Sequence, residues 1–489
     1  MIGQLPDLAH LPSAARQGWQ AASGLALTGV TADSREVGEG YLFAALPGSR
    51  ADGRAFIAEA VERGAAAVLA PLGTEWPAGV PPRPLIEDPE PRRRLAQLAA
   101  LLAGPAPAVL VAVTGTNGKT STVEFLRQIW AAADRPAASL GTLGLIAPGF
   151  PAGAGLTTPD PVRLAQILAA LTRAGVQHAA MEASSHGLDQ FRLDGVRLSA
   201  AAFTNLTRDH LDYHGSEAAY RAAKLRLFAE LLPPGAPAVA NADMDAQTLA
   251  ALREVAATRR LDLRTVGTAG EMLRLVSVVP RPDGQDIEVL ANGVRRHVAL
   301  PLPGRFQAEN ALMAAALAAA LGEREPLERL PLLMGVRGRM ELAARLPNAA
   351  AAYVDYAHTP DALKRLLTAL RPHTAQRLHV VFGAGGDRDS GKRPLMGAAA
   401  ARHADVVIVT DDNPRTEDPA AIRAAVLAAC PGAREIGDRE RAIAEALNAL
   451  GPGDVLVVAG KGHEQGQMVG NTVIPFDDVA VIRRLASVA

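Results

Sequence analysis

A glycine-rich stretch, Gly115-Thr-Asn-Gly-Lys-Thr-Ser121, constrains the fold of this chain more than any other feature. It follows a short apolar run, Val109–Val113, that is typical of a strand buried on both faces of a sheet. From Thr122 onward, apolar residues recur at helical spacing. Together these features predict a phosphate-binding loop, where main-chain N–H groups, a helix N-terminus and Lys119 attract phosphate. The Thr120 hydroxyl is expected to ligate Mg²⁺.

One position departs from the usual phosphate-loop pattern, because Val113 stands where the first glycine is expected. An ordinary glycine-rich turn between a strand and a helix is therefore the alternative interpretation. The apolar strand before the turn and the amphipathic helix after it favour the phosphate loop.

Length and composition narrow the class of protein. A chain of 489 residues, 49% of them hydrophobic, predicts about two to four packed domains. The net charge of −1 does not favour nucleic acid or an anionic membrane as partner. A single cysteine, Cys430, excludes an internal disulfide framework and fits a reducing compartment. The N-terminus has no signal-like segment and no membrane insertion is expected, so a cytoplasmic location is predicted.

Acidic and histidine side chains follow two predicted strands of the central segment. The strand His178–Glu182 ends in an acid, which beside a phosphate loop is a suitable oxygen ligand for Mg²⁺. The strand Ala200–Phe203 leads into a loop that carries Asp209, His210, Asp212 and His214. A zinc site is the competing interpretation of that loop, but the absence of a thiolate and the nearby phosphate loop favour a hard cation.

Two helices of the central segment are predicted from pattern. Lys224 lies in the expected helix Ala218–Leu231, where the pattern alone indicates an exposed lysine. The stretch Leu302–Asn310 is expected to cap an alanine-rich helix, Ala311–Leu321.

The last third of the chain alternates strands and helices, as in a parallel sheet with right-handed crossovers. The predicted strands are Ala351–Val354, Leu378–Phe382, Val406–Val409 and Val455–Val458. Ligands gather at the carboxyl ends of such strands. The side chains expected at that edge are Asp355, His358, Arg388, Asp412, Arg415, Lys461 and Glu464.

A set of motifs in one fixed order covers almost the whole chain. The motifs are Asp33-Ser-Arg, Gly115-Thr-Asn-Gly-Lys-Thr, Glu182-Ala-Ser-Ser-His-Gly, Thr204-Asn-Leu-Thr-Arg-Asp-His-Leu-Asp-Tyr-His, Gly338-Arg-Met-Glu, Asp412-Asn-Pro-Arg and Gly460-Lys-Gly-His-Glu. In these motifs the chain resembles the Mur ligases, ATP-dependent enzymes that build the peptide of bacterial cell-wall precursors. It is most similar to the branch that adds the third residue of that peptide.

The resemblance implies an α/β chain of three domains. They are a small N-terminal UDP-binding domain over residues 1–95, a central domain like P-loop ATPases with a mostly parallel sheet over 96–335, and a C-terminal Rossmann-like domain over 336–489 that binds the amino acid. A monomer is the expected state. Closure of the third domain is expected at a hinge near Gly335.

The resemblance also implies the ligands of individual residues. The ATP phosphates would bind Gly115, Thr116, Asn117, Gly118, Lys119, Thr120 and Ser121, and Asn310, Arg339 and Asp355 would contact the nucleotide. UDP-N-acetylmuramoyl-L-Ala-D-Glu would bind Ser34, Ser49, Arg50, Ala51, Thr157, Thr158, Ser184, Gln190 and Arg192. On pattern alone, Asp33-Ser34-Arg35 would be a solvated turn.

Metal and catalytic groups are implied in the same way. Thr120, Glu182 and His210 would help to bind Mg²⁺, with Lys119, Lys224 and His210 in catalytic roles. Lys224 matches the carbamylated lysine of the family, an N6-carboxylysine whose anion would position a second Mg²⁺. The D-Glu carboxylate would attack ATP to give an acyl phosphate, which the amine of a diamino acid then captures. The base that takes the proton of that amine is not assigned.

The acceptor amino acid is expected to be meso-diaminopimelate, with L-lysine or L-ornithine as alternatives. The residues implied to bind it are Arg388, Asp412, Asn413, Pro414, Arg415, Gly460 and Glu464. Arg388 and Arg415 suit a substrate that has two carboxylates, and Glu464 suits an ammonium. Arg337 stands where the family more often has Pro or Cys, which bears on the hinge and not on the reaction.

Other functions fit the sequence less well. A folylpolyglutamate synthetase shares the style of phosphate loop but is expected to lack the Asp33-Ser-Arg and Asp412-Asn-Pro-Arg motifs. A GTPase would need an Asn-Lys-x-Asp motif, which the sequence does not contain. A non-catalytic nucleotide-binding module would be expected to lose Lys119, Glu182 or Lys224, and all of them are present.

Overall fold

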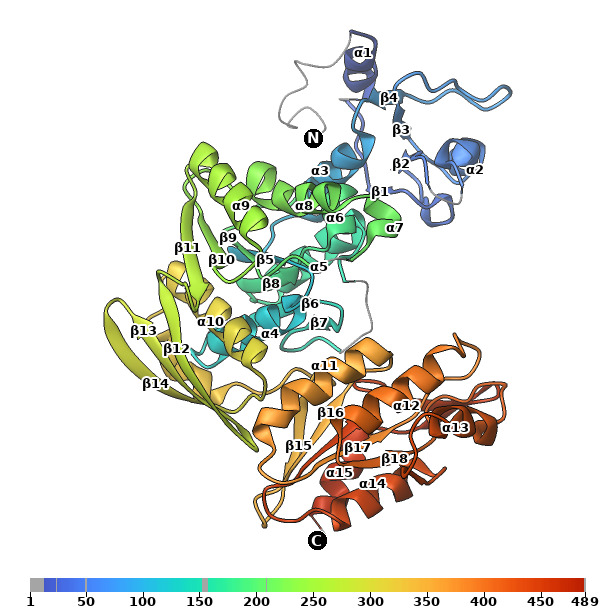
Figure 1. Cartoon of the computed structure of the whole chain (residues 1–489). Helices are drawn as coiled ribbons and strands as arrows, with labels where there is room; N and C mark the ends of the chain where they lie inside the picture. Colours follow the sequence, from blue (N-terminus) through green and yellow to red (C-terminus); the bar gives the residue numbers. More distant parts are fainter. Residues whose placement is uncertain (1–12, 23, 49–50, 152–156, 208, 488–489) are drawn as a thin grey trace. The chain divides into compact units, whose positions relative to one another are not determined.

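The computed structural model describes residues 13–22, 24–48, 51–151, 157–207 and 209–487 (Figure 1). The chain divides into two compact units, one formed by residues 1–264 with 317–322 and the other by residues 265–316 with 323–489. Among the described residues, no helix has the length and apolar character needed to cross a membrane.

The first unit begins with a four-stranded sheet whose strands are all parallel and lie in chain order. The strands are β1 (Gly29–Thr31), β2 (Tyr41–Ala44), β3 (Ala67–Pro71) and β4 (Leu85–Asp88), and the helices are α1 (Ser13–Ala22), α2 (Ile57–Glu62) and α3 (Pro91–Ala103). Strand side chains alternate between the faces, so Leu42 joins the core under α1 and α3 while Phe43 joins the core under α2. A 3₁₀ turn, Gly53–Phe56, precedes α2 and is capped by Asp52.

The second sheet of the first unit has the order β10-β9-β5-β8-β6-β7. Its strands are β5 (Val109–Thr114), β6 (Ala137–Gly141), β7 (Gly144–Ile146), β8 (His178–Glu182), β9 (Ala200–Phe203) and β10 (Pro237–Asn241). All neighbouring pairs are parallel except β6 and β7, which confirms the predicted mostly parallel sheet. Because β5 lies between β8 and β9, its glycine-rich turn lies between the loops that follow those two strands.

Helices pack on this sheet and contribute side chains to its buried core. The helices are α4 (Lys119–Ala131), α5 (Pro161–Arg173), α6 (Ser185–Asp189), α7 (Leu211–His214), α8 (Glu217–Arg226) and α9 (Ala246–Arg259). Leu164 of α5 and Leu252 of α9 share a core with Leu110 of β5. The helix predicted over 218–231 is α8 followed by a π-helical turn, Leu227–Leu231.

The second unit begins with β-rich structure. The elements that lie in it wholly or in part are β11 (Asp262–Gly267), β12 (Leu273–Arg281), β13 (Gly284–Ala291), β14 (Val294–Leu300) and α10 (Arg305–Ala320). The first three residues of β11 and the last four of α10 belong to the first unit. The turns at Asp283 and Asn292 join antiparallel strands. The expected cap of the next helix is wrong, because α10 begins at Arg305, directly after Gly304 in a left-handed conformation (φ 85°). Asn310 therefore lies inside the helix and not in its cap.

A six-stranded sheet with the order β15-β16-β20-β17-β18-β19 completes the second unit. The strands are β15 (Glu341–Arg345), β16 (Ala351–Asp355), β17 (Leu378–Phe382), β18 (Val406–Val409), β19 (Arg434–Glu435) and β20 (Val455–Ala459). Only β15 is antiparallel, so the predicted parallel strands are confirmed. A hairpin of β21 (Gly466–Val469) and β22 (Thr472–Pro475) follows β20.

Helices cover both faces of the six-stranded sheet (Figure 1). They are α11 (Pro360–Leu370), α12 (Lys392–His403), α13 (Pro419–Leu427), α14 (Arg439–Asn448) and α15 (Asp478–Ala486). Val457 of β20 joins the core under α11, α12 and α13, and its neighbour Val458 joins the core under α14 and α15. This is a three-layer α/β arrangement, in which the loops at the carboxyl ends of the strands form one edge.

Candidate functional site

The glycine-rich turn forms the loop between β5 and α4. Gly118 has a left-handed conformation (φ 86°) at the N-cap of α4, which starts with Lys119. At Gly115, also at positive φ, a Cβ atom would overlap Thr204 Oγ1 of the loop after β9. Both positions therefore require glycine, as in a loop that must bring its backbone close to a phosphate.

The loop after β9 holds the glycine-rich turn in place. The Asn117 N–H donates to Asn205 Oδ1 (2.9 Å) and the Thr116 N–H donates to the Asn205 carbonyl (2.9 Å). Lys119 Nζ donates to the carbonyl oxygens of Gly115 and Thr116, both at 3.0 Å. The lysine side chain therefore curls back over the turn to which it belongs.

Glu182 lies at the carboxyl end of β8, directly beside β5. Its side chain is almost fully buried (1% exposed). Oε1 accepts hydrogen bonds from Thr120 Oγ1 (2.9 Å) and from the Thr142 N–H (2.8 Å). A hydroxyl and a carboxylate oxygen at the start of α4 form a donor set that suits Mg²⁺, which prefers hard oxygen ligands. The predicted residues Thr120 and Glu182 are thus brought together and fit the ion.

Lys224 is buried (1% exposed), so the interpretation of this residue as an exposed lysine is wrong. Its Nζ donates to the Gly115 carbonyl (2.8 Å) and lies 4.6 Å from the centre of the Tyr220 ring. Burial, and then the nearby charge of Lys119, lower the pKa of Lys224 to about 6. The amine is therefore neutral at physiological pH, which is the form that reacts with CO₂.

Tyr220 is a residue of this site that the sequence interpretation missed. It is buried, and its hydroxyl lies 3.1 Å from Thr116 Oγ1 in the glycine-rich turn. Tyr220, Lys224 and Leu227 follow one another at helical spacing along one buried stripe of the chain. That spacing is the sequence signal that would have indicated a buried lysine.

His210 lies at the surface near the same turn, with positive φ (51°). Its N–H donates to Asp209 Oδ1 (2.9 Å), and its ring centre lies 4.9 Å from that of His186, edge to face. Among the described residues, no three His, Cys, Asp or Glu side chains are grouped so as to hold a metal ion. The side chain of Asp212 lies outside the described part of the structure.

Most residues expected to bind the muramoyl dipeptide form one chain of hydrogen bonds. Thr158 Oγ1 donates to the Glu182 carbonyl (3.0 Å) and accepts from the Ser184 N–H (3.0 Å). Arg192 donates to the Thr158 carbonyl (2.6 Å) and to Gln190 Oε1 (2.7 Å). Thr157 belongs to the same group, since its Oγ1 lies 3.1 Å from Thr142 Oγ1. These residues are therefore linked directly to the acid at the end of β8.

Two of the residues expected to bind uridine diphosphate, Ser34 and Ala51, lie in connections between the strands of the N-terminal sheet. Ser34 is buried and its Oγ donates to Glu59 Oε2 (2.7 Å). Ala51 is exposed, and its carbonyl accepts from the Gly48 N–H (3.0 Å). Ser49 and Arg50 lie outside the described residues.

The second unit holds the remaining residues expected at the nucleotide. Asp355 ends β16, and its carboxylate accepts from the main-chain N–H groups of Met340 and Ala357, both at 2.8 Å. Burial raises the pKa of Asp355. The Arg339 guanidinium lies over the Tyr356 ring at 5.4 Å. Asn310 is buried in α10, where its amide donates to Gln307 Oε1 (3.2 Å).

The residues expected to bind the amino acid gather at the carboxyl ends of β17, β18 and β20. Arg415 Nη1 donates to the Gly386 carbonyl (2.7 Å), and a Cβ atom at Gly385 would lie near the side chains of both Arg415 and Arg388. The two arginines predicted to share a dicarboxylic substrate therefore flank one glycine. Asp412 lies beside Gly460, where a Cβ atom would come within 2.5 Å of its Oδ2. Pro414 is buried in the same loop.

Arg415 has a left-handed backbone (φ 52°), which is uncommon for a residue other than glycine. The β21–β22 hairpin holds it there: the Arg415 N–H donates to the Met468 carbonyl (3.1 Å) and its own carbonyl accepts from the Gly470 N–H (2.7 Å). The backbone at the acceptor loop is thus fixed by a neighbouring element.

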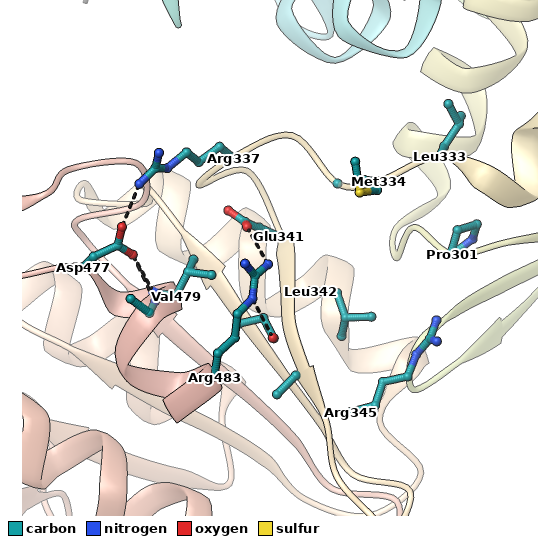
Figure 2. Close-up of a pocket in the computed structure, with 14 residues that line it drawn as sticks. Pro301, Leu333, Met334, Arg337, Glu341, Leu342, Arg345, Asp477, Val479 and Arg483 are labelled. Atoms are coloured by element: carbon teal, nitrogen blue, oxygen red, sulfur yellow. Dashed lines mark hydrogen bonds and ion pairs between the residues drawn. The ribbon is translucent and has the colours of Figure 1, made fainter. Parts of the chain in front are cut away.

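A cavity of about 780 Å³ in the second unit contains none of the expected ligand-binding residues (Figure 2). Arg337 donates to Asp477 (2.7 Å), the N-cap of α15, and Arg483 donates to Glu341 and to the Ala343 carbonyl, both at 3.3 Å. Arg337 and Arg483 are thus each paired with another group of the lining, and the cavity lies beside the edge strand β15.

Comparison with known proteins defines the class. Residues 26–101 match the Mur ligase family catalytic domain, residues 113–318 the Mur ligase middle domain, and residues 338–462 the Mur ligase glutamate ligase domain. The chain belongs to the Mur ligase family, and its three domains are those of that family.

Individual relatives are similar to this chain over almost its whole length. A protein of Caulobacter vibrioides is 57% identical over 93% of this chain and 94% of its own length, and one of Rhizobium meliloti is 51% identical over 98% and 99%. Both are named UDP-N-acetylmuramoyl-L-alanyl-D-glutamate--2,6-diaminopimelate ligase. A solved structure of a ligase with that name is 34% identical, covers 94% of this chain and 95% of its own, and has a TM-score of 0.75. A folylpolyglutamate synthase structure (20% identity over 76% of this chain, TM-score 0.57) shares the fold alone.

Proposed function

We propose that this chain is an ATP-dependent ligase that joins 2,6-diaminopimelate to the D-Glu of UDP-N-acetylmuramoyl-L-Ala-D-Glu through an acyl phosphate. The observation that carries the proposal is the group around Gly115, where the Thr120–Glu182 pair and the buried Lys224 meet a phosphate loop. Relatives that are more than half identical and carry the name of this ligase support the same reaction. The acceptor is taken to be the meso form.

The first half of the reaction is assigned to the first unit. The main-chain N–H groups of Gly115–Ser121 and Lys119 would hold the phosphates of ATP and neutralise charge that develops on the γ-phosphate. Thr120 and Glu182 would hold Mg²⁺ with help from His210, and the ion would supply charge neutralisation at the phosphates. Thr157, Thr158, Ser184, Gln190 and Arg192 would hold the dipeptide so that the D-Glu carboxylate meets the γ-phosphate.

Lys224 is proposed to act as an N6-carboxylysine. Its pKa of about 6 leaves a neutral amine, whose lone pair can add to CO₂ with loss of one proton. The product is an anion, which would position a second Mg²⁺. The same burial that makes a charged ammonium unfavourable thus favours the modification.

The second half of the reaction is assigned to the acceptor loops. Arg388 and Arg415 would bind the distal carboxylate of the amino acid, and Glu464 would bind its distal ammonium. The attacking amine must be neutral; it adds to the acyl phosphate carbon, and phosphate leaves as the amide forms. Ser34, Ser49, Arg50 and Ala51 would hold the uridine diphosphate, and Asn310, Arg339 and Asp355 the nucleotide.

An ADP-release assay tests the proposal. Purified protein receives ATP, Mg²⁺ and UDP-N-acetylmuramoyl-L-Ala-D-Glu with meso-diaminopimelate, L-lysine or L-ornithine in separate reactions. We expect ADP and a tripeptide product, identified by mass, with meso-diaminopimelate. Faster turnover with lysine or ornithine would change the acceptor but not the reaction. Turnover only with a folate and glutamate would reject the ligase proposed here. Absence of turnover with every combination of substrates would reject it as well.

A further inference from the structure

Lys461 is a fully buried lysine (0% exposed), separated from the end of β20 by Gly460 alone. Its Nζ donates to Asn413 Oδ1 (3.0 Å) and to Glu464 Oε2 (3.3 Å). Burying an ammonium is costly unless it is paired and hydrogen-bonded. Lys461, Asn413 and Glu464 thus form one contact between the two loops that are proposed to bind the amino acid.

Asn413 joins these groups rather than facing outward. Its Oδ1 accepts from both Lys461 Nζ and the Met468 N–H (2.9 Å), and its Nδ2 donates to Glu464 Oε2 (3.0 Å). An amide oxygen has two acceptor positions, so the protein itself fills both of them. Asn413 therefore links the loop after β18 to the loop after β20 and to the β21 strand.

The two loops come from strands that are not neighbours, because β17 lies between β18 and β20. The loop after β18 can cross the chain after β17 because glycines lie at the two points of closest approach. A Cβ atom at Gly383 would lie 2.9 Å from the Asp412 nitrogen, and one at Gly386 would overlap the Pro414 carbonyl. Lys461 is the group that fastens the crossing loop to the β20 loop.

The result is a carboxylate with one fixed oxygen. Glu464 Oε2 is held by Asn413 and Lys461, while the side chain as a whole is 34% exposed. Lys461 reduces the net negative charge at Glu464, so its contribution to binding an ammonium is orientation and not attraction. Without the lysine, Glu464 Oε2 would keep only the hydrogen bond from Asn413 Nδ2, and the carboxylate would be less firmly oriented.

We propose that Lys461 is a positioning residue of the acceptor site, which orients Glu464 for the distal ammonium of the incoming diamino acid. The inference rests on the proposed function, since it assumes that an amino acid binds at these loops. Because Lys461 is buried, it acts through Glu464 and Asn413 and does not contact the substrate.

The test separates the two halves of the reaction. In the absence of the amino acid, hydroxylamine traps an acyl phosphate as a hydroxamate, which reports the first half only. For Lys461→Met, which keeps the length and removes the charge, we expect unchanged hydroxamate formation. The KM for meso-diaminopimelate should rise about tenfold or more, the size expected when a hydrogen bond to a charged group is lost. The KM for ATP should stay the same. Lys364→Met on the exposed face of α11 is the matched control.

A second variant keeps the test decisive if Lys461→Met folds poorly. Lys461→Gln keeps a polar side chain in the same place but removes the positive charge, so Glu464 Oε2 loses its charged partner. We expect the same selective rise in the acceptor KM. An unchanged or lower acceptor KM in both variants, or a loss of hydroxamate equal to the loss of amide in both, would overturn the role. If the wild-type protein forms no hydroxamate, the proposed function itself fails.

Discussion

The lysines at the phosphate loop and the lysine at the acceptor loops are held in different ways. Lys224 is buried and donates to a main-chain carbonyl, that of Gly115. Lys461 is equally buried, but it donates to the side chains of Asn413 and Glu464. The Gly115 carbonyl supplies no counter-charge to Lys224, whereas Glu464 supplies a carboxylate to Lys461.

The comparison shows that a buried lysine can have two roles, which depend on the groups that accept its hydrogen bonds. At Lys224 burial lowers the pKa to about 6 and favours a neutral, reactive amine. At Lys461 a carboxylate accompanies the lysine, and the pair becomes part of the framework of a binding site. A buried lysine is therefore chemically informative only when its partners are known. The predictions below test each side of this comparison.

The largest effect is expected at the phosphate loop. Lys119→Ala removes a cation at the γ-phosphate and should lower ADP release by about a thousandfold or more, since charge stabilisation of this kind dominates phosphoryl transfer. A coupled ADP assay measures it, with Lys364→Ala as control. Retention of a tenth of the wild-type rate would remove the loop from the mechanism.

The next effect tests the neutral amine. Lys224→Ala should lower ADP release by about a hundredfold or more, because the anion that positions the second Mg²⁺ is lost. Added formate or acetate should restore part of the activity by supplying a carboxylate in the vacated space. If no short carboxylate restores activity while thermal unfolding shows a folded variant, the carboxylysine is not the active form.

The acceptor loops should respond selectively. Arg415→Ala is expected to raise the KM for meso-diaminopimelate about tenfold to a hundredfold, the size of a lost charge-assisted hydrogen bond. Slow turnover with L-lysine, where it is detectable, should change little, because lysine has no second carboxylate. Steady-state kinetics with both acceptors measure this. An equal loss with every diamino acid would contradict the specificity argument.

The pH dependence follows from the pKa of Lys224, which is lowered to about 6. Above that pH the amine is neutral and can take up CO₂; below it, each unit of pH should reduce the reactive fraction about tenfold. Protein equilibrated with ¹³C-bicarbonate should show a carbamate signal by NMR near pH 8 that fades as the pH falls through 6. Lys224→Arg should lack the signal, and a carbamate in that variant would place the modification elsewhere.

The smallest effect is expected in the cavity of Figure 2. Arg337 and Asp477 form an ion pair in which both side chains are partly exposed (45% and 23%). Arg337→Ala should therefore lower the free energy of unfolding by less than about 1 kcal/mol. Urea unfolding measures the change. A much larger loss would show that the pair does not behave as an ordinary exposed ion pair.

Much of this architecture could be predicted because its signals are local. The apolar run before Gly115 and the strand that ends in Glu182 follow from hydrophobic pattern, and the structure places them side by side. The four parallel strands of the last third follow in the same way. The boundaries near residues 95 and 335, and the ligands of individual residues, stay predictions.

What could not be predicted depends on tertiary contacts. Lys224 looks exposed in an alanine-rich helix until Tyr220 and Leu227 reveal the buried stripe to which it belongs. Asn310 looked like part of a cap because Leu302–Gly304 contains turn residues, but the left-handed Gly304 lets the helix begin directly after it. The role of Asn413 depends on partners more than fifty residues away along the chain.

The crossing of the β18 loop over Gly383 and Gly386 has a consequence for protein engineering. A graft of Asp412–Arg415 from a relative with a different acceptor preference would replace only the loop after β18. The room for that loop depends on Gly383 and Gly386, and its attachment depends on Lys461. Redesign of the acceptor must therefore exchange the segments after β17, β18 and β20, together with the β21–β22 hairpin, as a single cassette.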